Sequence, residues 1–261
     1  MPQRLANKTA MITGASRGIG YAIASAYAAE GCNIILNARD PKRLSDAAER
    51  IRNEFDVDVS VAAFDVSDRD AVERAVEHTW TQSPIDILVN NAGIYKAQPF
   101  IDYTAEDFHD IFDVNIFGVI HITQALLRRM MPVRRGVVVN IASTAGKWGS
   151  RNQSAYNMSK HAIVGLTRCV ALEMAAHEIR VNAICPWIVD TDLAEEFTQA
   201  HADILDLPQA TVADNLKRTI PLHQRWIKPQ EVAGLAVYLS SEESSYVTGQ
   251  AWTIDGGYTT I

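Results

Sequence analysis

The sequence lacks the features that mark disulfide-rich, membrane-spanning and metal-binding proteins. Its three cysteines are widely spaced and odd in number, so we interpret Cys32, Cys169 and Cys185 as buried reduced thiols and expect no metal site. No uninterrupted apolar run approaches the ~20 residues of a membrane span. The first eight residues, Met1 to Lys8, contain no apolar signal core. These absences predict a cytoplasmic protein that does not bind a membrane.

Positive charge is also scarce. There are 24 basic and 31 acidic residues, which give a net charge of -7 and a pI near 5.5. This balance argues against a nucleic-acid-binding protein. The chain shows no internal repeat, no low-complexity segment and no linker. Its 261 residues and 48% hydrophobic content favour one domain that covers residues 1–261.

A glycine-rich turn lies between a short apolar strand and a helical pattern near the N-terminus. Residues 8–13 have the character of a buried strand, residues 14–20 read GASRGIG, and the helical pattern runs to Glu30. Glycines permit a sharp turn and close approach of a ligand, and the following helix directs its first amides at that turn. The spacing G-x-x-x-G-x-G differs from the usual G-x-G-x-x-G of dinucleotide sites. An ordinary turn is the alternative, but the flanking strand and helix favour dinucleotide binding.

The end of the second apolar strand, residues 33–38, bears on the choice of cofactor. NAD-binding folds usually place an acidic residue there to hold the ribose hydroxyls, whereas this chain has Ala38 followed by Arg39. Arg39 could pair with a 2′-phosphate, and Arg17 in the glycine turn could supply a second cation. Asp40 could neutralise Arg39. The pattern predicts NADP(H) and leaves NAD(H) possible.

The remaining pattern alternates between strands and helices. We therefore expect an α/β fold, a single-domain Rossmann-like doubly wound parallel sheet of about seven strands with helices on both faces. The charged stretch at residues 190–220 is too long for a connector, and we expect a substrate lid or wall there. The other expected strands cover residues 57–64, 85–89, 136–141, 179–184 and 249–254, and the other expected helices cover residues 41–54, 104–131, 154–177 and 229–240.

Tyr156 and Lys160 stand four residues apart, near the start of a long helical pattern. This spacing places both on one face of a helix, one turn from each other. An ammonium ~4 Å from a phenolate supplies about 4 kcal/mol at an effective dielectric of ~20. That attraction predicts a phenol pKa about three units below its usual value, less whatever desolvation removes. The pair suits acid/base chemistry, although a solvated helix face is the alternative.

Three other polar residues stand out against apolar surroundings. Asn115 lies among apolar residues, where its amide either makes a local structural bond or marks a kink that holds a water near Lys160. Ser143 follows an expected strand, at the carboxyl edge where open α/β sheets bind ligands. Asp65 ends another strand, and either contacts adenine or stabilises a turn.

Taken together, these residues resemble the short-chain dehydrogenase/reductase family in its compact subclass of about 250 residues. The resemblance covers roughly residues 7–258 and is similar in detail to 3-oxoacyl carrier-protein reductases and polyketide ketoreductases. The matching segments, in the order in which the family has them, are Thr13 to Gly20, Asp65, Asn90 to Gly93, Asn115, Ser143, Tyr156 and Lys160.

The resemblance implies a role for each matching residue. Tyr156 would be the general acid/base, Ser143 would hydrogen-bond the substrate oxygen, Lys160 would tune Tyr156 and hold the nicotinamide ribose, and Asn115 would support a water-linked proton relay. It also implies a homotetramer or homodimer. The residues expected to bind the cofactor are Gly14, Ser16, Arg17, Gly18, Ile19, Gly20, Arg39, Asp65, Val66, Asn91, Ala92, Gly93, Tyr156, Lys160, Pro186, Val189 and Thr191.

One position departs from the family pattern. The family usually has Pro-Gly after strand six, where this chain has Pro186-Trp187. Trp187 cannot adopt the backbone freedom of glycine, and its ring could fill part of the substrate pocket. Together with Trp148, Phe197 and Trp226 it could wall an apolar pocket, which favours cyclic or aromatic ketones.

The predicted function is an NADP(H)-dependent oxidoreductase that transfers hydride between the nicotinamide and a small-molecule carbonyl or secondary alcohol, with Tyr156 as general acid/base. Three alternatives remain. One is the same chemistry with NAD(H) on a hydroxy acid, sugar or polyol. Another is a catalytically idle nucleotide-binding sensor. The third, an epimerase or dehydratase of the longer branch of the superfamily, is disfavoured because those chains carry an added substrate domain.

Overall fold

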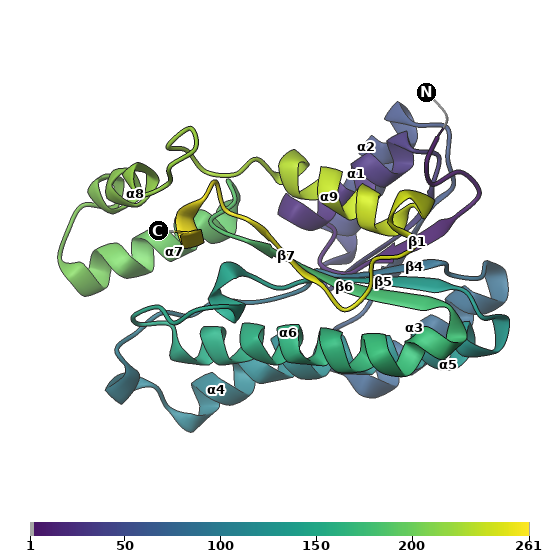
Figure 1. Ribbon diagram of the computed structural model, residues 1–261, viewed down its shortest axis with the longest axis horizontal. Coiled ribbons are helices and arrows are strands. Elements are labelled where there is room, and N and C mark those ends of the chain that lie inside the picture. The colour runs from purple at the N-terminus through teal and green to yellow at the C-terminus, as the bar shows by residue number, and fades with distance from the viewer. Residues whose placement is uncertain (1–2, 261) are drawn as a thin grey trace.

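The protein is built on one parallel seven-stranded sheet with the strand order β3-β2-β1-β4-β5-β6-β7 (Figure 1). The computed structural model describes residues 3–260. All neighbouring strands pair in parallel, which confirms the predicted doubly wound fold. The strands are β1 (Thr9–Ile12), β2 (Asn33–Ala38), β3 (Val59–Ala63), β4 (Ile87–Asn90), β5 (Gly136–Ile141), β6 (Ile179–Pro186) and β7 (Ala251–Ile254).

The order of the strands reverses between β1 and β4. These two strands pair in register, with Met11 opposite Leu88, and every residue of both is buried. Their continuous apolar runs are typical of strands covered by helices on both faces. A crevice opens beyond the carboxyl ends of the strands at such a reversal. The glycine turn after β1 and residues 91–93 after β4 both lie at this position.

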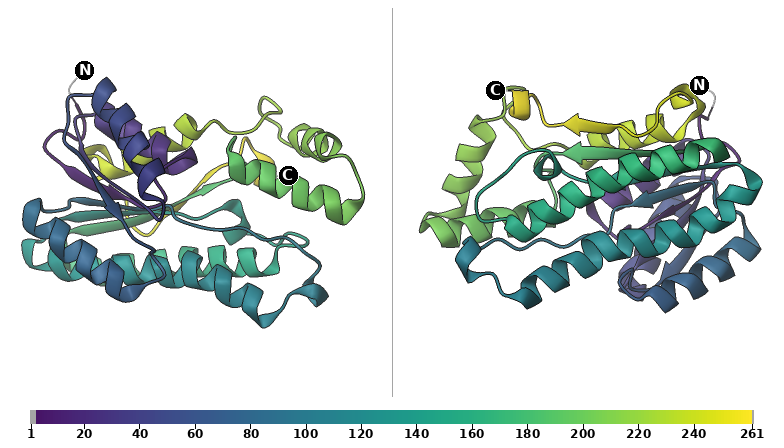
Figure 2. Two further views of the ribbon diagram at one scale, coloured as in Figure 1. Left: turned by 180° about the vertical axis from the view of Figure 1, so that it is seen from behind. Right: turned by 60° about the horizontal axis from the view of Figure 1, so that its bottom comes forward.

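Helices cover both faces of the sheet in two layers (Figures 1 and 2). One layer holds α1 (Gly18–Ala29), α2 (Pro41–Glu54) and α9 (Pro229–Ser240). The other holds α3 (Arg69–Gln82), α4 (Ala105–Phe112), α5 (Gly118–Val133) and α6 (Ser154–Met174). Each layer has its own apolar core, because successive strand residues point to opposite faces: Ile12 and Leu36 pack on one side, and Met11 and Leu88 on the other.

The helical stretch from Ala105 to Val133 is interrupted by a π-helical turn at Asp113–Phe117, between α4 and α5. This π-helical turn contains Asn115, for which the sequence suggested either a local hydrogen bond or a kink in the helix. The whole stretch is long and apolar enough to meet the length and composition criteria for a membrane span, but half of its most apolar window is buried inside the protein. It packs here as a core helix.

Two helices, α7 (Asp192–Leu205) and α8 (Gln209–Arg218), extend beyond the sheet on the side of its carboxyl ends (Figures 1 and 2). They occupy most of the stretch expected to form a lid. Short 3₁₀ turns complete the chain at Phe100–Asp102, Thr144–Gly146, Ala175–His177, Glu242–Ser244 and Tyr258–Thr260.

The structure corrects a few local expectations. β3 begins two residues after the expected start at residue 57, and β6 continues to Pro186 instead of ending at residue 184. The expected burial of all three cysteines is wrong for Cys169, which is exposed on α6, whereas Cys32 and Cys185 are buried. Helical periodicity tolerates a small apolar residue on either face, so the sequence did not determine which face Cys169 takes.

Candidate active site

The glycine turn after β1 is held against the loop after β4. Gly14 and Gly18 have φ values of 62° and 59°, a left-handed backbone that glycine adopts readily. The hydroxyl of Thr13 accepts hydrogen bonds from the amides of Asn91 and Ala92, at 2.9 and 3.0 Å. The turn is therefore fixed to its neighbour before any ligand binds.

Gly20 brings α1 close to this junction. A Cβ atom at Gly20 would lie 2.5 Å from both the carbonyl oxygen of Gly14 and the Nδ2 of Asn91. That Nδ2 donates to the carbonyl oxygens of Thr13 and Gly14, at 3.0 and 3.1 Å. Only glycine fits at this contact, because any side chain would displace the backbone of the turn.

A long cavity runs along the carboxyl ends of β1, β2 and β4. It fits an extended dinucleotide, because a glycine turn at the start of α1 lies at one side and small residues after β4 form another. Most of the residues expected to bind a cofactor line this nucleotide cavity: Gly14, Ser16, Arg17, Gly18, Ile19, Arg39, Asp65, Val66, Asn91, Ala92, Gly93 and Thr191. Gly20 lies behind the turn, and its role there is one of close packing.

Three arginines line the nucleotide cavity, and each is paired with a carboxylate. Nε of Arg43 lies 3.5 Å from Oδ2 of Asp40. Nη1 of Arg39 lies 3.7 Å from Oδ2 of Asp65, and Arg17 forms an ion pair with Asp192 at the start of α7. Asp40 instead caps α2, where its Oδ1 accepts hydrogen bonds from the amides of residues 42 and 43, at 2.9 and 3.1 Å. The sequence suggested Asp40 as the residue that neutralises Arg39, but the structure gives that position to Asp65.

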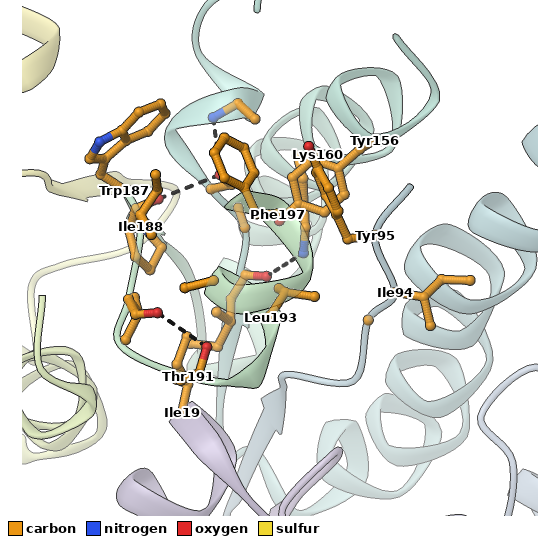
Figure 3. Close-up of a pocket in the computed structure, with 18 of the residues that line it drawn as sticks. Ile19, Ile94, Tyr95, Tyr156, Lys160, Trp187, Ile188, Thr191, Leu193 and Phe197 are labelled. Carbon is orange, nitrogen blue, oxygen red and sulfur yellow. Dashed lines mark hydrogen bonds between the residues drawn. The ribbon is translucent and has the colours of Figure 1, made fainter. Parts of the chain in front are cut away.

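Three of the four expected catalytic residues line a second cavity (Figure 3). This cavity shares Gly93 and Thr191 with the first. Ser143 follows β5, and Tyr156 and Lys160 lie on the first turns of α6. Nζ of Lys160 donates to the carbonyl oxygen of Ile141 at 3.0 Å and lies 5.6 Å from the centre of the Tyr156 ring. Pro186 and Val189, expected to contact the cofactor, line this catalytic cavity as well.

Burial dominates the electrostatics of the catalytic cavity. It raises the pKa of Tyr156 to about 12, although a hydrogen bond with Ser143 offsets part of this rise. It lowers the pKa of Lys160 to about 8. The expected lowering of the Tyr156 pKa by Lys160 is therefore wrong for this structure. The lysine loses its proton at a lower pH than the phenol, so its charge is absent at the pH where the phenol ionises.

Asn115 supports the floor of the site from behind. Its Oδ1 accepts from the amide of Ile94 at 2.8 Å, and its Nδ2 donates to the carbonyl of Ile94 at 3.0 Å and to the hydroxyl of Ser159 at 3.2 Å. Asn115 thus satisfies its amide locally and joins the loop after β4 to α6. The local hydrogen bond expected for Asn115 is therefore present, and it lies in the π-helical turn where a kink was expected. The proton relay through water stays a prediction.

This arrangement has close counterparts among known proteins. A family model described as enoyl-(acyl carrier protein) reductase matches residues 14–259. The chain belongs to the short-chain dehydrogenase/reductase family.

Relatives across the family cover nearly the whole chain. Oxidoreductase UcpA of Salmonella typhimurium is 41% identical over 98% of this chain and 96% of its own length. A 3-oxoacyl-[acyl-carrier-protein] reductase of Thermotoga maritima is 37% identical over 97% of this chain and 98% of its own. These matches confirm the resemblance to oxidoreductases of this family, including the carrier-protein reductases.

Solved structures of related proteins share the fold over nearly the whole chain. A single-site variant of actinorhodin polyketide ketoreductase with NADPH superimposes with a TM-score of 0.93 at 32% identity, and covers 99% of each chain. An NAD+-bound xylitol dehydrogenase gives a TM-score of 0.94 at 32% identity, over 97% of this chain and 100% of its own. Members with this fold therefore include structures with either nicotinamide cofactor.

The tryptophan that distinguishes this short-chain dehydrogenase/reductase from the family pattern belongs to an aromatic cluster. Trp187 stacks on Tyr258, with ring centres 4.1 Å apart and planes 14° from parallel, and Trp148 meets both rings edge-on. Trp187 and Phe197 line the catalytic cavity as expected. Trp148 lies behind Trp187, and Trp226 lines a separate cavity near α7 and α8. The expectation of a pocket wall was wrong for these two residues.

Two polar residues of the catalytic cavity were missed by the sequence analysis of this short-chain dehydrogenase/reductase. Tyr95 lies in the loop after β4, and Gln153 precedes Tyr156 by three residues. Their closeness in sequence to Gly93 and Tyr156 was a signal that they lie near the site. Local sequence could not show that both residues line the cavity.

Proposed function

We propose that this protein is an NADP(H)-dependent oxidoreductase that interconverts a carbonyl compound and a secondary alcohol. The observation that carries the proposal is the position of Tyr156. Its side chain is half-buried beside Ser143 and Lys160, in a mainly apolar cavity that shares Gly93 and Thr191 with the nucleotide cavity. A substrate carbonyl in the one cavity would thus lie next to a nicotinamide that enters from the other.

The nicotinamide, when bound, supplies or accepts the hydride. Tyr156 is protonated at neutral pH because burial raises its pKa to about 12, so it is ready to donate a proton to the substrate oxygen during reduction. The Ser143 hydroxyl accepts a hydrogen bond from the amide of Ala145 at 3.1 Å, which fixes its oxygen beside the phenol. Ser143 and Tyr156 would together stabilise the charge that develops on the carbonyl oxygen.

Lys160 carries its positive charge at neutral pH, because its pKa of about 8 still lies above neutrality. The hydrogen bond to Ile141 holds it beneath Gly93, where a Cβ atom would lie 3.8 Å from its Nζ. The ammonium would therefore contact the ribose next to the nicotinamide and favour the negative charge that forms when Tyr156 gives up its proton.

NADP(H) is favoured over NAD(H) by the chemistry of the nucleotide cavity. β2 ends in Ala38, and Arg17 and Arg39 both line the cavity where a 2′-phosphate would lie. The actinorhodin ketoreductase with NADPH supports this choice. NAD(H) is the second candidate, because Asp65 and Asp192 already pair with the two arginines and a xylitol dehydrogenase of the same fold is NAD+-bound.

We further infer that α7 and α8 act as a substrate lid and that the protein is a cytoplasmic homo-oligomer acting on small molecules. Leu193 and Phe197 of α7 line the catalytic cavity, which supports the lid. Leu172, Met158 and Phe117 are exposed on the α5–α6 side of the molecule, which supports a subunit contact there.

The function is tested by the Tyr156→Phe variant, with NADPH and NADH oxidation followed on a panel of cyclic ketones, keto sugars and acyl thioesters. Removal of the phenol hydroxyl should lower turnover at least ~100-fold, because the proposed proton donor is lost from the reacting oxygen. Binding of NADPH, followed by its fluorescence, should be retained. Undiminished turnover would contradict the proposed mechanism.

The same panel addresses the sensor alternative. A nucleotide sensor would bind NADPH but would oxidise it with none of the substrates, in the wild type as well as in the variant. Turnover of any ketone by the wild type excludes a sensor. Better turnover with NADH than with NADPH would reverse the cofactor choice and leave the carbonyl chemistry intact.

A further inference from the structure

The catalytic cavity contains a buried hydroxyl that the proposed chemistry does not use. The Tyr95 hydroxyl is inaccessible to solvent and, within residues 3–260, has no hydrogen-bond partner. Its ring meets that of Tyr156 edge-on at 5.1 Å between centres and lies 5.4 Å from the ring of Phe197. Figure 3 shows the three rings together at one side of the cavity. Tyr95 thus stands directly beside the proposed proton donor.

A second uncommitted polar group lies in the same cavity. Gln153 is only 5% exposed and lines the cavity one turn before Tyr156. It is the N-cap residue of α6, but its side chain makes no capping hydrogen bond. Its side-chain amide also has no other hydrogen bond within the part of the chain that the structure describes. The amide can both donate and accept, and the Tyr95 hydroxyl can do so as well.

These two groups contrast with the rest of the cavity wall. The wall away from the catalytic residues is mainly apolar and includes Ile94, Leu193, Phe197 and the ring of Trp187. The indole Nε1 of Trp187 is the exception, because it too is buried without a partner among the described residues. Lys160 is the one cation among the described residues of the lining, and it already donates to Ile141. Burial raises the pKa of Tyr95, so its hydroxyl stays neutral. A buried polar group without a partner is unfavourable, and is retained most readily where a ligand completes it.

We propose that Tyr95 and Gln153 form a second recognition point for the substrate, which selects a neutral cyclic ketone carrying a second oxygen. The ring would lie against the aromatic and aliphatic wall, and the second oxygen would exchange hydrogen bonds with the Tyr95 hydroxyl and the Gln153 amide. A carboxylate or phosphate at that place would be buried without a cation, so acidic substrates are excluded. This inference rests on the proposed carbonyl chemistry and specifies its substrate class.

The test compares matched ketones that differ only in the second oxygen. Cyclohexanone and its 2-, 3- and 4-hydroxy derivatives would be reduced by the wild type and by Tyr95→Phe, and kcat/KM measured for each. The wild type should prefer at least one hydroxyketone over cyclohexanone by about tenfold or more. Tyr95→Phe should lower kcat/KM for that hydroxyketone about tenfold and leave cyclohexanone within about twofold.

Two further variants separate recognition from structure. Tyr103→Phe is the matched control, because the Tyr103 hydroxyl donates to the carbonyl of Lys96 at 2.8 Å and lies outside the cavity lining. It should lower the melting temperature without changing selectivity, whereas Tyr95→Phe should leave the melting temperature unchanged or raised. Gln153→Leu should cause a loss similar to that of Tyr95→Phe, and the double variant should lose less than the product of the two if both residues hold the same oxygen.

The possible outcomes distinguish failure of the proposed recognition point from failure of the proposed reductase function. If the wild type reduces cyclohexanone and the hydroxyketones equally, or if Tyr95→Phe slows all of them alike, the recognition point is wrong and the reductase proposal stands. If the keto acid 5-ketogluconate is reduced better than every neutral ketone, the selection for neutral substrates is wrong. If no ketone is reduced by the wild type, the proposed function fails and this inference fails with it.

Discussion

The two cavities of the site differ in how their polar groups are satisfied. In the nucleotide cavity the three arginines already have partners: Arg17 is paired with Asp192, Arg39 with Asp65 and Arg43 with Asp40. In the catalytic cavity the neutral Tyr95 hydroxyl is buried without a partner within residues 3–260, and the neutral Gln153 side chain makes no capping hydrogen bond. An exposed ion pair is weak and easily exchanged for a phosphate, whereas a buried neutral group is satisfied only by a ligand with a matching polar atom. The first cavity is thus suited to a common cofactor and the second to selection of a substrate.

The largest expected effect on the nucleotide cavity comes from a substitution at Gly20, which packs behind the glycine turn. Gly20→Ala would place a Cβ atom 2.5 Å from the carbonyl oxygen of Gly14 and shift the turn. Overpacking of this kind costs about 2 kcal/mol, so we expect NADPH affinity to fall about 30-fold, together with a lower melting temperature. Fluorescence titration with NADPH measures the affinity.

The control for this variant is Gly234→Ala, in the middle of α9. A Cβ atom there would have no other atom within 4 Å, so stability should be unchanged or increased by up to ~1 kcal/mol. Equal affinity for NADPH in Gly20→Ala and the wild type would show that the close packing of α1 does not shape the turn.

The catalytic cavity is tested by the pH dependence of reduction. Lys160 has a pKa of about 8, so its positive charge is nearly complete at about pH 6.5 and is lost as the pH rises through that pKa. The rate should therefore fall about tenfold between about pH 7 and about pH 9 if the charge is needed. Steady-state rates across this range, with NADPH affinity measured at each pH, check the prediction.

The effect of Lys160 ionisation on protein stability does not explain such a fall in rate. Because the folded-state pKa of about 8 lies below the usual 10.5, burial of the charged lysine costs stability at pH values below the folded-state pKa. That cost diminishes as the pH rises from about 8 to 10.5, so this group makes the protein more stable over the range in which the rate should decline. A flat rate up to about pH 10 would remove Lys160 from the mechanism.

The smallest expected effect is on the ion pair between Arg17 and Asp192 in the nucleotide cavity. Asp192→Asn would free Arg17 for a 2′-phosphate, and NADPH affinity should rise about threefold, because an exposed pair such as this contributes at most ~1 kcal/mol. NADH affinity should stay unchanged, since NADH lacks that phosphate. The matched control is Asp190→Asn, which removes the same charge nearby without touching Arg17. A gain of equal size for NADH, or in the control, would show a general charge effect.

Much of the fold and of the candidate site followed from local patterns. Alternating apolar strands and amphipathic helices predict a doubly wound sheet, and the carboxyl ends of its parallel strands bring Ser143 and the glycine turn to one edge. Tyr156 and Lys160 lie on one helix, so their spacing alone places them together. Asn115 was recognisable because an amide among apolar residues needs a partner.

Other features depend on contacts between segments that are far apart in sequence. Arg17 and Asp192 are 175 residues apart, and no local pattern links them. Trp226 has the same apolar character as Trp187, yet it lines a different cavity, near α7 and α8. The sequence shows that such residues are apolar or charged, but not which neighbours they meet.

The sequence by itself determined the family, the sheet and the candidate catalytic residues, because these depend on periodicity and on motifs within single elements. Only the tertiary structure decided the sign of the Tyr156 pKa shift, since burial by surrounding elements outweighs the lysine one turn away. It also decided that Tyr95 and Gln153 line the cavity, and that the buried Tyr95 hydroxyl has no partner among the described residues. Hydrogen bonding and desolvation depend on the whole packed environment of a group, and that environment is assembled from every layer of the fold.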